Sequence, residues 1–211
     1  GLCGEIHRAP PRAEGALLEA VSEGRGTVDG DACELPRPLR GVARQNPVDH
    51  EGTYPLPEAQ LDRFLMRFTL GYPSFDDELK MLSVLEAEHP IDRLEPVIAT
   101  NELVACQQAV RAVHVDQKVR EYLLQIVHLS RDHEELSLGG SPRASIALFR
   151  TSQAMAAVRG RSYVRPDDVK RIATAVLNHR LILTPESRLR HVTASQVSDE
   201  SIDQVTVPTV E

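Results

Sequence analysis

The sequence predicts an α/β region followed by an all-α region, with the boundary near residue 73. Before that point, short apolar stretches are separated by Gly, Pro and an Asp29-Gly30 pair, as in strands joined by turns. From Ser74 onward the apolar residues recur at helical spacing. The 211 residues, 41% of them hydrophobic, are enough for one large domain or two small ones.

The first region is expected to begin with a strand, a helix and a hairpin. Residues 1–6 indicate the end of a short buried strand, and the prolines at positions 10 and 11 are typical of a helix start. The glycines at positions 24 and 26 end that helix. The Asp-Gly pair at residues 29–30 supplies the positive-φ residues of a tight hairpin turn.

The rest of this region is expected to present polar groups at the end of a strand. Residues 39–43 are predicted as a short strand that delivers Gln45 and Asn46 to its C-terminal end, where α/β sheets bind ligands. Residues 58–65 are predicted as a helix and residues 68–70 as a further strand. On spacing alone, residues 45–64 are more typical of a long, proline-rich surface loop.

The second region is predicted to contain five helices. Ser74, Asp116 and the pair Ser141-Pro142 are typical helix starts, and Pro166 opens the last helix. Residues 101–112 are predicted as the second of the five. Two of these helices carry apolar faces, formed by Val119, Leu123, Ile126 and Val127, and by Val169, Ile172, Ala173, Val176 and Leu177. The polar tail over residues 191–211 is unassigned.

Composition limits the function. A net charge of −7 argues against a broad nucleic-acid-binding surface, which needs a basic face. Three scattered cysteines favour a reducing, cytoplasmic setting, and no apolar run is long enough for a membrane span. The cluster formed by His128, Asp132, His133 and Glu134 lacks the HExxH pattern, so we predict no metal ligands there.

Four segments together identify a family. They read GEIHRAPPRAEGALLEAVSEGRGTVDG, LPRPLRGVARQNPVDHEGTYPLPEAQLDRF, GGSPRASIALFRTSQAMAAVRGRSYVRPDDV and NHRLIL. In order and spacing they resemble the MoxR family of AAA+ ATPases over nearly all the chain up to about residue 190. The resemblance implies a truncated AAA+ core (P-loop NTPase-like) with a β-hairpin over residues 1–73, a helical lid over residues 74–190 and a tail over residues 191–211.

The resemblance also implies a catalytic role for Glu5. In this family a buried strand ends in Asp-Glu, the Asp holding Mg²⁺ through water and the Glu polarising the attacking water. That pair aligns with Gly4 and Glu5. Glu5 retains the carboxylate of a general base, whereas loss of the Asp is expected to weaken Mg²⁺ binding. The alternative is that Glu5 merely ends a strand.

Three further residues match family motifs. Asn46 corresponds to the first sensor, whose amide orients water near the γ-phosphate; the alternative is a simple turn residue before Pro47. Arg63 in LDRF resembles the arginine finger that completes a neighbouring subunit's site, although a pair with Glu58 or Asp62 would also explain it. Arg143 resembles the second sensor, which reaches from the lid to the nucleotide; the alternative is a solvent-exposed arginine.

The resemblance implies ATP and Mg²⁺ as cofactors and a hexameric ring that remodels or matures partner proteins, some with von Willebrand factor A domains. The phosphate-loop motif GxxxxGK[ST] is not in this sequence, and Gly1 is not a start residue, so we expect that motif upstream. The chain alone is expected to be inactive as an ATPase. The alternative function is a degenerate, non-hydrolysing interaction module.

Overall fold

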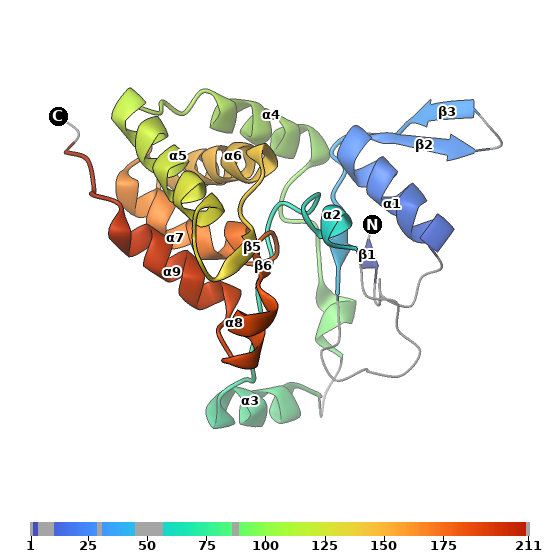
Figure 1. The fold of residues 1–211 in the computed structure, drawn as a ribbon. Coiled ribbons are helices and arrows are strands. Elements are labelled where there is room, and N and C mark those ends of the chain that lie inside the picture. The colour runs from blue at the N-terminus through green and yellow to red at the C-terminus, as the bar shows by residue number, and fades with distance from the viewer. Residues whose placement is uncertain (1, 4–10, 29–30, 45–56, 86–88, 210–211) are drawn as a thin grey trace.

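The computed structural model describes residues 2–3, 11–28, 31–44, 57–85 and 89–209. Figure 1 shows a small α/β part around the N-terminus and a larger helical bundle that carries the C-terminus. The segment that contains α2 and α3 connects the two parts along the chain.

The α/β part contains the predicted strands and hairpin. β1 (Leu2–Cys3) pairs in parallel with β4 (Val42–Ala43), and α1 (Pro11–Glu23) follows β1 in the chain. β2 (Arg25–Val28) pairs antiparallel with β3 (Asp31–Glu34). The register places Val28 opposite Asp31, which confirms the hairpin predicted from residues 29–30, although these two residues lie outside the described ones.

The segment after the α/β part is less regular than predicted. α2 (Glu58–Leu61) is shorter than the predicted helix over residues 58–65. The predicted strand over residues 68–70 is wrong: the backbone there has no regular secondary structure, and Phe68 and Leu70 are 71% and 90% exposed. A strand needs a hydrogen-bonded neighbour, and no described residue supplies one to this segment.

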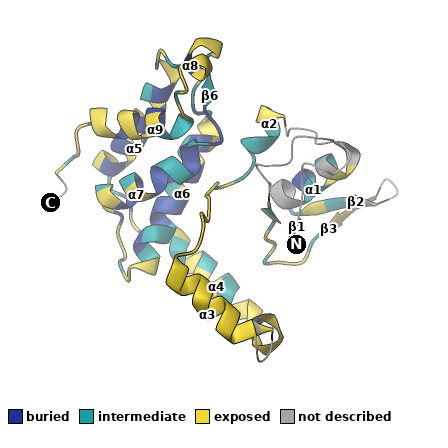
Figure 2. Ribbon diagram, turned by 90° about the horizontal axis from the view of Figure 1, so that it is seen from below, coloured by how far each residue is buried: buried dark blue, intermediate teal, exposed yellow. Residues whose placement is uncertain are grey.

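α3 (Phe75–Leu85) begins where Ser74 predicts it. The Ser74 hydroxyl accepts the backbone N–H of Asp77 at 3.3 Å. The apolar side chains of this helix are exposed, however, with Phe75 at 81%, and Figure 2 shows α3 exposed along its length. A short 3₁₀ helix, η2 (Pro90–Arg93), follows.

The helical bundle contains α4 (Thr100–Arg111), α5 (Gln117–Arg131), α6 (Pro142–Val158), α7 (Pro166–Leu177), α8 (Pro185–Leu189) and α9 (Ala194–Gln204), with a short antiparallel pair, β5 (Leu136–Leu138) and β6 (Ile182–Leu183). In this bundle, α4 to α7 follow the predicted order, whereas α8, α9 and the short strand pair were not predicted. The side chains of Asp116 and Ser141 cap α5 and α6 as predicted.

The hydrophobic core lies inside this bundle. The predicted apolar faces of α5 and α7 are both buried, as Figure 2 shows. α9, in the tail that the sequence left unassigned, adds Val197 and Ile202 to the same core and packs against α5 and α7. None of the helices in the described ranges combines the length and apolar character needed to cross a bilayer.

Candidate functional site

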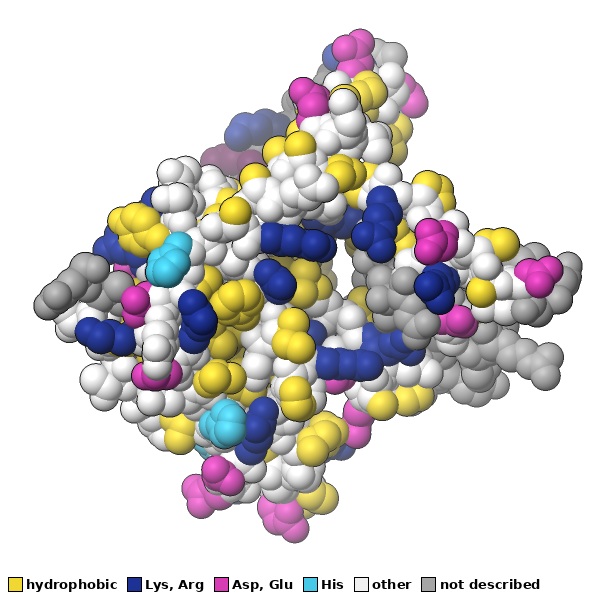
Figure 3. Space-filling view, turned by 90° about the horizontal axis from the view of Figure 1, so that it is seen from above, with side chains coloured by type: hydrophobic (Ala, Val, Ile, Leu, Met, Phe, Trp, Pro, Cys, Tyr) yellow, Lys and Arg dark blue, Asp and Glu magenta, His cyan; other side chains and the backbone are white. Residues whose placement is uncertain are grey.

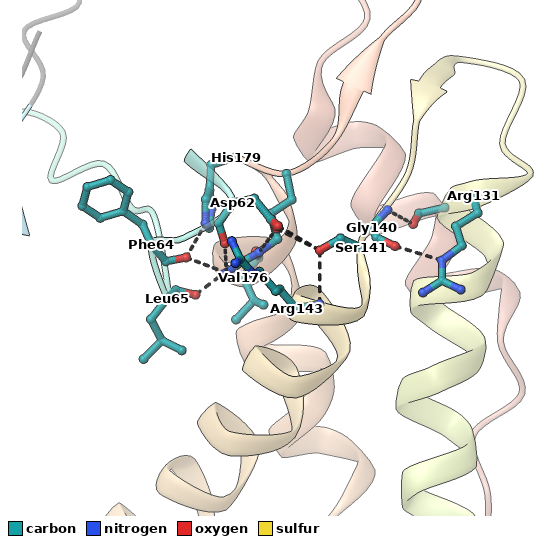
Figure 4. A network of polar contacts seen from close by, with 11 residues as sticks. Asp62, Phe64, Leu65, Arg131, Gly140, Ser141, Arg143, Val176 and His179 are labelled. Carbon is teal, nitrogen blue, oxygen red and sulfur yellow. Dashed lines mark hydrogen bonds and ion pairs between the residues drawn. The ribbon is translucent and has the colours of Figure 1, made fainter. Parts of the chain in front are cut away.

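The structure describes two of the four predicted site residues. Glu5 and Asn46, with Gly4, fall outside the described residues. Arg63 and Arg143 lie inside them, on segments that meet at the junction between α2 and the bundle (Figure 4). In the described part of the chain, no group of three His, Cys, Asp or Glu side chains could hold a metal ion.

Arg63 lies in the turn that follows α2. Its side chain is partly buried, and its backbone N–H donates to the Gln60 carbonyl at 3.1 Å. On the same segment, Asp62 lies 3.1 Å from Arg180, and Glu58 lies 3.9 Å from Arg188.

Arg143 is the second residue of α6 and is exposed. Ser141 accepts the Arg143 backbone N–H at 3.1 Å, and Pro142 occupies the first helical position, where no N–H is needed. α6 is 17 residues long. The positive end of its dipole and the Arg143 guanidinium therefore attract anions together, and this donor set suits a phosphate group.

The loop before α6 is fixed on the end of α5. The Gly140 N–H donates to the Ser130 hydroxyl and the Gly140 carbonyl accepts from Arg131 Nε, both at 2.9 Å (Figure 4). A Cβ on Gly139 would lie 2.3 Å from the Ser130 carbonyl oxygen. Glycine is thus required there because the two backbones touch, which positions the N-terminus of α6.

Asp62 joins these segments. Its carboxylate accepts from the Ser141 hydroxyl, with Oγ 3.0 and 3.1 Å from the two oxygens, and pairs with Arg180 Nε at 3.1 Å. Arg180, whose side chain is 2% exposed, also donates to the carbonyls of Asp62, Phe64, Leu65 and Val176 (Figure 4). A buried guanidinium thus has partners for its donors.

Burial controls the charges at this junction. Desolvation lowers the pKa of Arg180, and Asp62 opposes this effect while the nearby Arg143 adds to it. Desolvation also lowers the pKa of His179 to about 4, although its hydrogen bond with the Phe64 carbonyl acts in the opposite direction. Since a carbonyl only accepts, His179 Nε2 carries the proton in that 2.9 Å contact. Arg180 is therefore the charged member of the pair, and His179 is neutral at pH 7.

Basic side chains gather on one face of the molecule. Figure 3 shows Lys and Arg side chains in the middle of the face, around the hollow between the two parts of the molecule. Asp and Glu side chains lie mostly toward its edges. This local concentration of positive charge favours an anionic ligand even though the whole chain carries a charge of −7.

The sequence predicts Ser141 only as a helix cap and Asp62 only as a partner for Arg63, and it predicts no role for His179 or Arg180. The segment LNHRLIL does contain a signal, because Arg180 lies within an apolar stretch. A buried arginine in such a stretch needs a carboxylate or carbonyl partner. The sequence does not say which partner, since Asp62 lies 118 positions away.

Comparison with known proteins matches both parts of the chain. Residues 2–66 match the family model "ATPase family associated with various cellular activities (AAA)", and residues 128–205 match that of the AAA lid domain. These matches confirm the predicted fold class, an α/β core segment followed by a helical lid.

Individual proteins agree with these models. YeaC of Bacillus subtilis is 47% identical over 207 residues, which are 98% of this chain and 65% of YeaC. Chaperone MoxR1 of Mycobacterium tuberculosis is 34% identical over 99% of this chain and 57% of its own length. A crystal structure from Cytophaga hutchinsonii, of a protein proposed to be an ATPase, has a TM-score of 0.92 at 30% identity and covers 99% of this chain. This chain spans 66% of that structure, so it covers about two thirds or less of each of these proteins.

Proposed function

Because this chain belongs to the MoxR family of AAA+ ATPases, we propose that the protein hydrolyses ATP. The energy released would be used to remodel or mature partner proteins, in a chaperone-like way. The name of Chaperone MoxR1 supports the chaperone-like part of the proposal. The observation that carries the proposal is the junction at Asp62, which bonds the Arg63 segment to the helix that bears Arg143.

Each site residue has a distinct role in this proposal. Arg143 and the N-terminus of α6 hold phosphate charge of the nucleotide bound to the same subunit. Arg63 stabilises the charge that develops on the phosphoryl group in a neighbouring subunit. Asn46 orients the attacking water and Glu5 accepts its proton. ATP supplies the phosphoryl group that is transferred to water.

The remaining parts of the proposal concern assembly and surroundings. A finger that acts on a neighbour requires an oligomer, and we propose a hexameric ring. We further propose a cytoplasmic location and partner proteins that include von Willebrand factor A domains. The net charge of −7 disfavours nucleic acid as a partner.

A non-hydrolysing interaction module is the second candidate. Gly4 favours it, because the family has the Mg²⁺-binding Asp at this position and a glycine offers no side-chain oxygen. In such a module the lid and hairpin would serve as binding surfaces, and the retained arginines would have no catalytic role.

The test mixes two inactive variants of the full-length protein. Glu5→Gln removes the base and Arg63→Ala removes the finger, so each alone is expected to lose ATPase activity. A mixture restores sites that combine Glu5 from one subunit with Arg63 from the next, and phosphate release should return. Glu58→Gln is the control, because this exposed carboxylate lies on the same segment. A wild-type protein without ATPase activity would favour the interaction module.

A further inference from the structure

Asp62 lies where three separate segments of the chain meet. Its carboxylate accepts from Ser141 at the start of α6 and pairs with Arg180, which follows α7. These contacts join residues that are 79 and 118 positions apart. The side chain of Asp62 is 20% exposed and that of Arg180 is 2% exposed, so water screens this pair weakly.

The lid holds the backbone on both sides of Arg63. Arg180 donates to the Asp62 carbonyl at 3.3 Å, to the Phe64 carbonyl at 2.5 Å and to the Leu65 carbonyl at 3.3 Å. α2 has only four residues and is too short to maintain its shape alone. Contacts from the lid, more than the helix itself, therefore fix the direction of the turn that carries Arg63.

The Ser141 hydroxyl has two partners at once. It accepts the N–H of Arg143 and donates its single proton to the Asp62 carboxylate. A movement of the first turn of α6 relative to the turn after α2 would therefore alter both hydrogen bonds. The Ser141 hydroxyl therefore both caps α6 and connects this helix to Asp62.

We propose that Asp62 is a positioning residue that transmits the position of the Arg143 helix turn to Arg63. The inference rests on the proposed function, in which Arg143 contacts the nucleotide of its own subunit and Arg63 acts on the next. The path from Arg143 through Ser141 and Asp62 to Arg63 consists only of hydrogen bonds and one peptide bond. Nucleotide binding in one subunit thereby sets the finger that is presented to its neighbour.

The first experiment uses amide hydrogen exchange, without nucleotide, to test whether the Ser141–Asp62 hydrogen bond links the start of α6 to the turn after α2. The amides of Arg63, Phe64 and Arg67 report on the turn, and that of Ala144 reports on the first turn of α6, since all four are hydrogen-bonded. Ser141→Ala removes both cap and link, so all four amides should exchange about tenfold faster.

Ser141→Asp separates the two roles of this hydroxyl. Aspartate is a good N-cap, so the Ala144 amide should remain protected. The new carboxylate faces Asp62 and repels it, so the amides of Arg63, Phe64 and Arg67 should still exchange about tenfold faster. Wild-type exchange in the turn of Ser141→Asp would overturn the link. Glu58→Gln is the matched control and should change none of these amides, because Glu58 pairs with Arg188 outside the link.

The second experiment tests transmission in the full-length protein. Asp62→Asn keeps the shape but removes the charge, and ATPase activity should fall about tenfold. A mixture with Glu5→Gln should regain activity, because Glu5→Gln supplies an intact finger. A mixture with Arg63→Ala should not, because both variants lack a positioned finger. Binding of a fluorescent ATP analogue to Asp62→Asn should stay within about twofold of wild type.

Each result has a defined meaning. If ATPase activity recovers when Asp62→Asn is mixed with Arg63→Ala, Asp62 does not act through Arg63. If activity recovers with neither variant, or if the ATP analogue binds more weakly, Asp62→Asn has a general structural defect. Each of these three results would overturn the proposal. If the wild-type protein has no ATPase activity, the proposed function fails and the transmission role fails with it. The exchange experiment would still decide whether the physical link exists.

Discussion

Arg161 and Asp168 form a two-pronged ion pair, with guanidinium nitrogens 2.7 and 2.6 Å from the two carboxylate oxygens. Asp168 is fully buried, and it also caps the start of α7 by accepting the N–H of Arg165 at 2.9 Å. Burial alone would raise the pKa of Asp168, but the hydrogen bonds from Arg161 and Arg165 outweigh it, and the pKa is lowered. Asp168 is therefore charged, and its charge is fully compensated.

Loss of this charge should destabilise the lid strongly. Asp168→Asn leaves Arg161 without its counter-ion, and we expect the free energy of unfolding to fall by about 3 kcal/mol. Asp167→Asn is the matched control: its side chain is 70% exposed and 4.0 Å from Arg165, so a change within about 0.5 kcal/mol is expected. Urea unfolding at pH 7 measures both, and equal losses would contradict the assignment.

His179 should make the protein less stable in mild acid. Its pKa is about 4 in the folded chain and 6.5 when unperturbed, so between these values the unfolded state binds the extra proton. Stability should thus fall as the pH is lowered from 7 toward 4, by up to roughly 3 kcal/mol. His179→Gln cannot titrate. Its unfolding free energy should depend less on pH over this window, and parallel pH curves would refute the prediction.

Gly139→Ala should disturb the start of α6. The new methyl group would lie 2.3 Å from the Ser130 carbonyl oxygen, and only backbone movement relieves that clash. We expect a loss of about 1–3 kcal/mol, measured by thermal unfolding. Gly15→Ala in α1 meets nothing within 4 Å and should leave the melting temperature unchanged or slightly higher. A tolerated Gly139→Ala would show that the loop is not closely packed on α5.

The chain of residues 1–211 is expected to show no ATPase activity by itself. The motif GxxxxGK[ST], whose backbone and lysine hold the β- and γ-phosphates, does not occur in it. Phosphate release from purified chain should equal that of Glu5→Gln. Turnover by the wild-type chain that Glu5→Gln abolishes would contradict this expectation.

Local signals in the sequence were sufficient to predict α5, α6 and α7 of the bundle, but not α8 or α9. Ser141-Pro142 marks the start of α6 because capping and proline placement depend on neighbouring residues alone, and the apolar faces of α5 and α7 follow helical periodicity. The strand predicted over residues 68–70 fails for the opposite reason, since a strand is defined by its partner. α3 shows that helical spacing predicts a helix without guaranteeing its burial.

The candidate site was only partly predictable. Arg63 and Arg143 were identified through a family resemblance, and the sequence offered an alternative for each. The contacts that join their segments are between residues 79 and 118 positions apart, and such pairings depend on the packing of whole helices. No periodicity or short motif encodes them. The roles of Glu5, Asn46, Arg63 and Arg143 stay predictions.

The separation of Asp62 and Arg180 also sets an order of events during synthesis. A ribosome working at 5–20 residues per second makes Arg180 roughly 6–24 s after Asp62. Throughout that interval the turn that carries Arg63 has no guanidinium to hold its carbonyls. The turn after α2 therefore reaches its final conformation only once the lid residues that contact it have been translated.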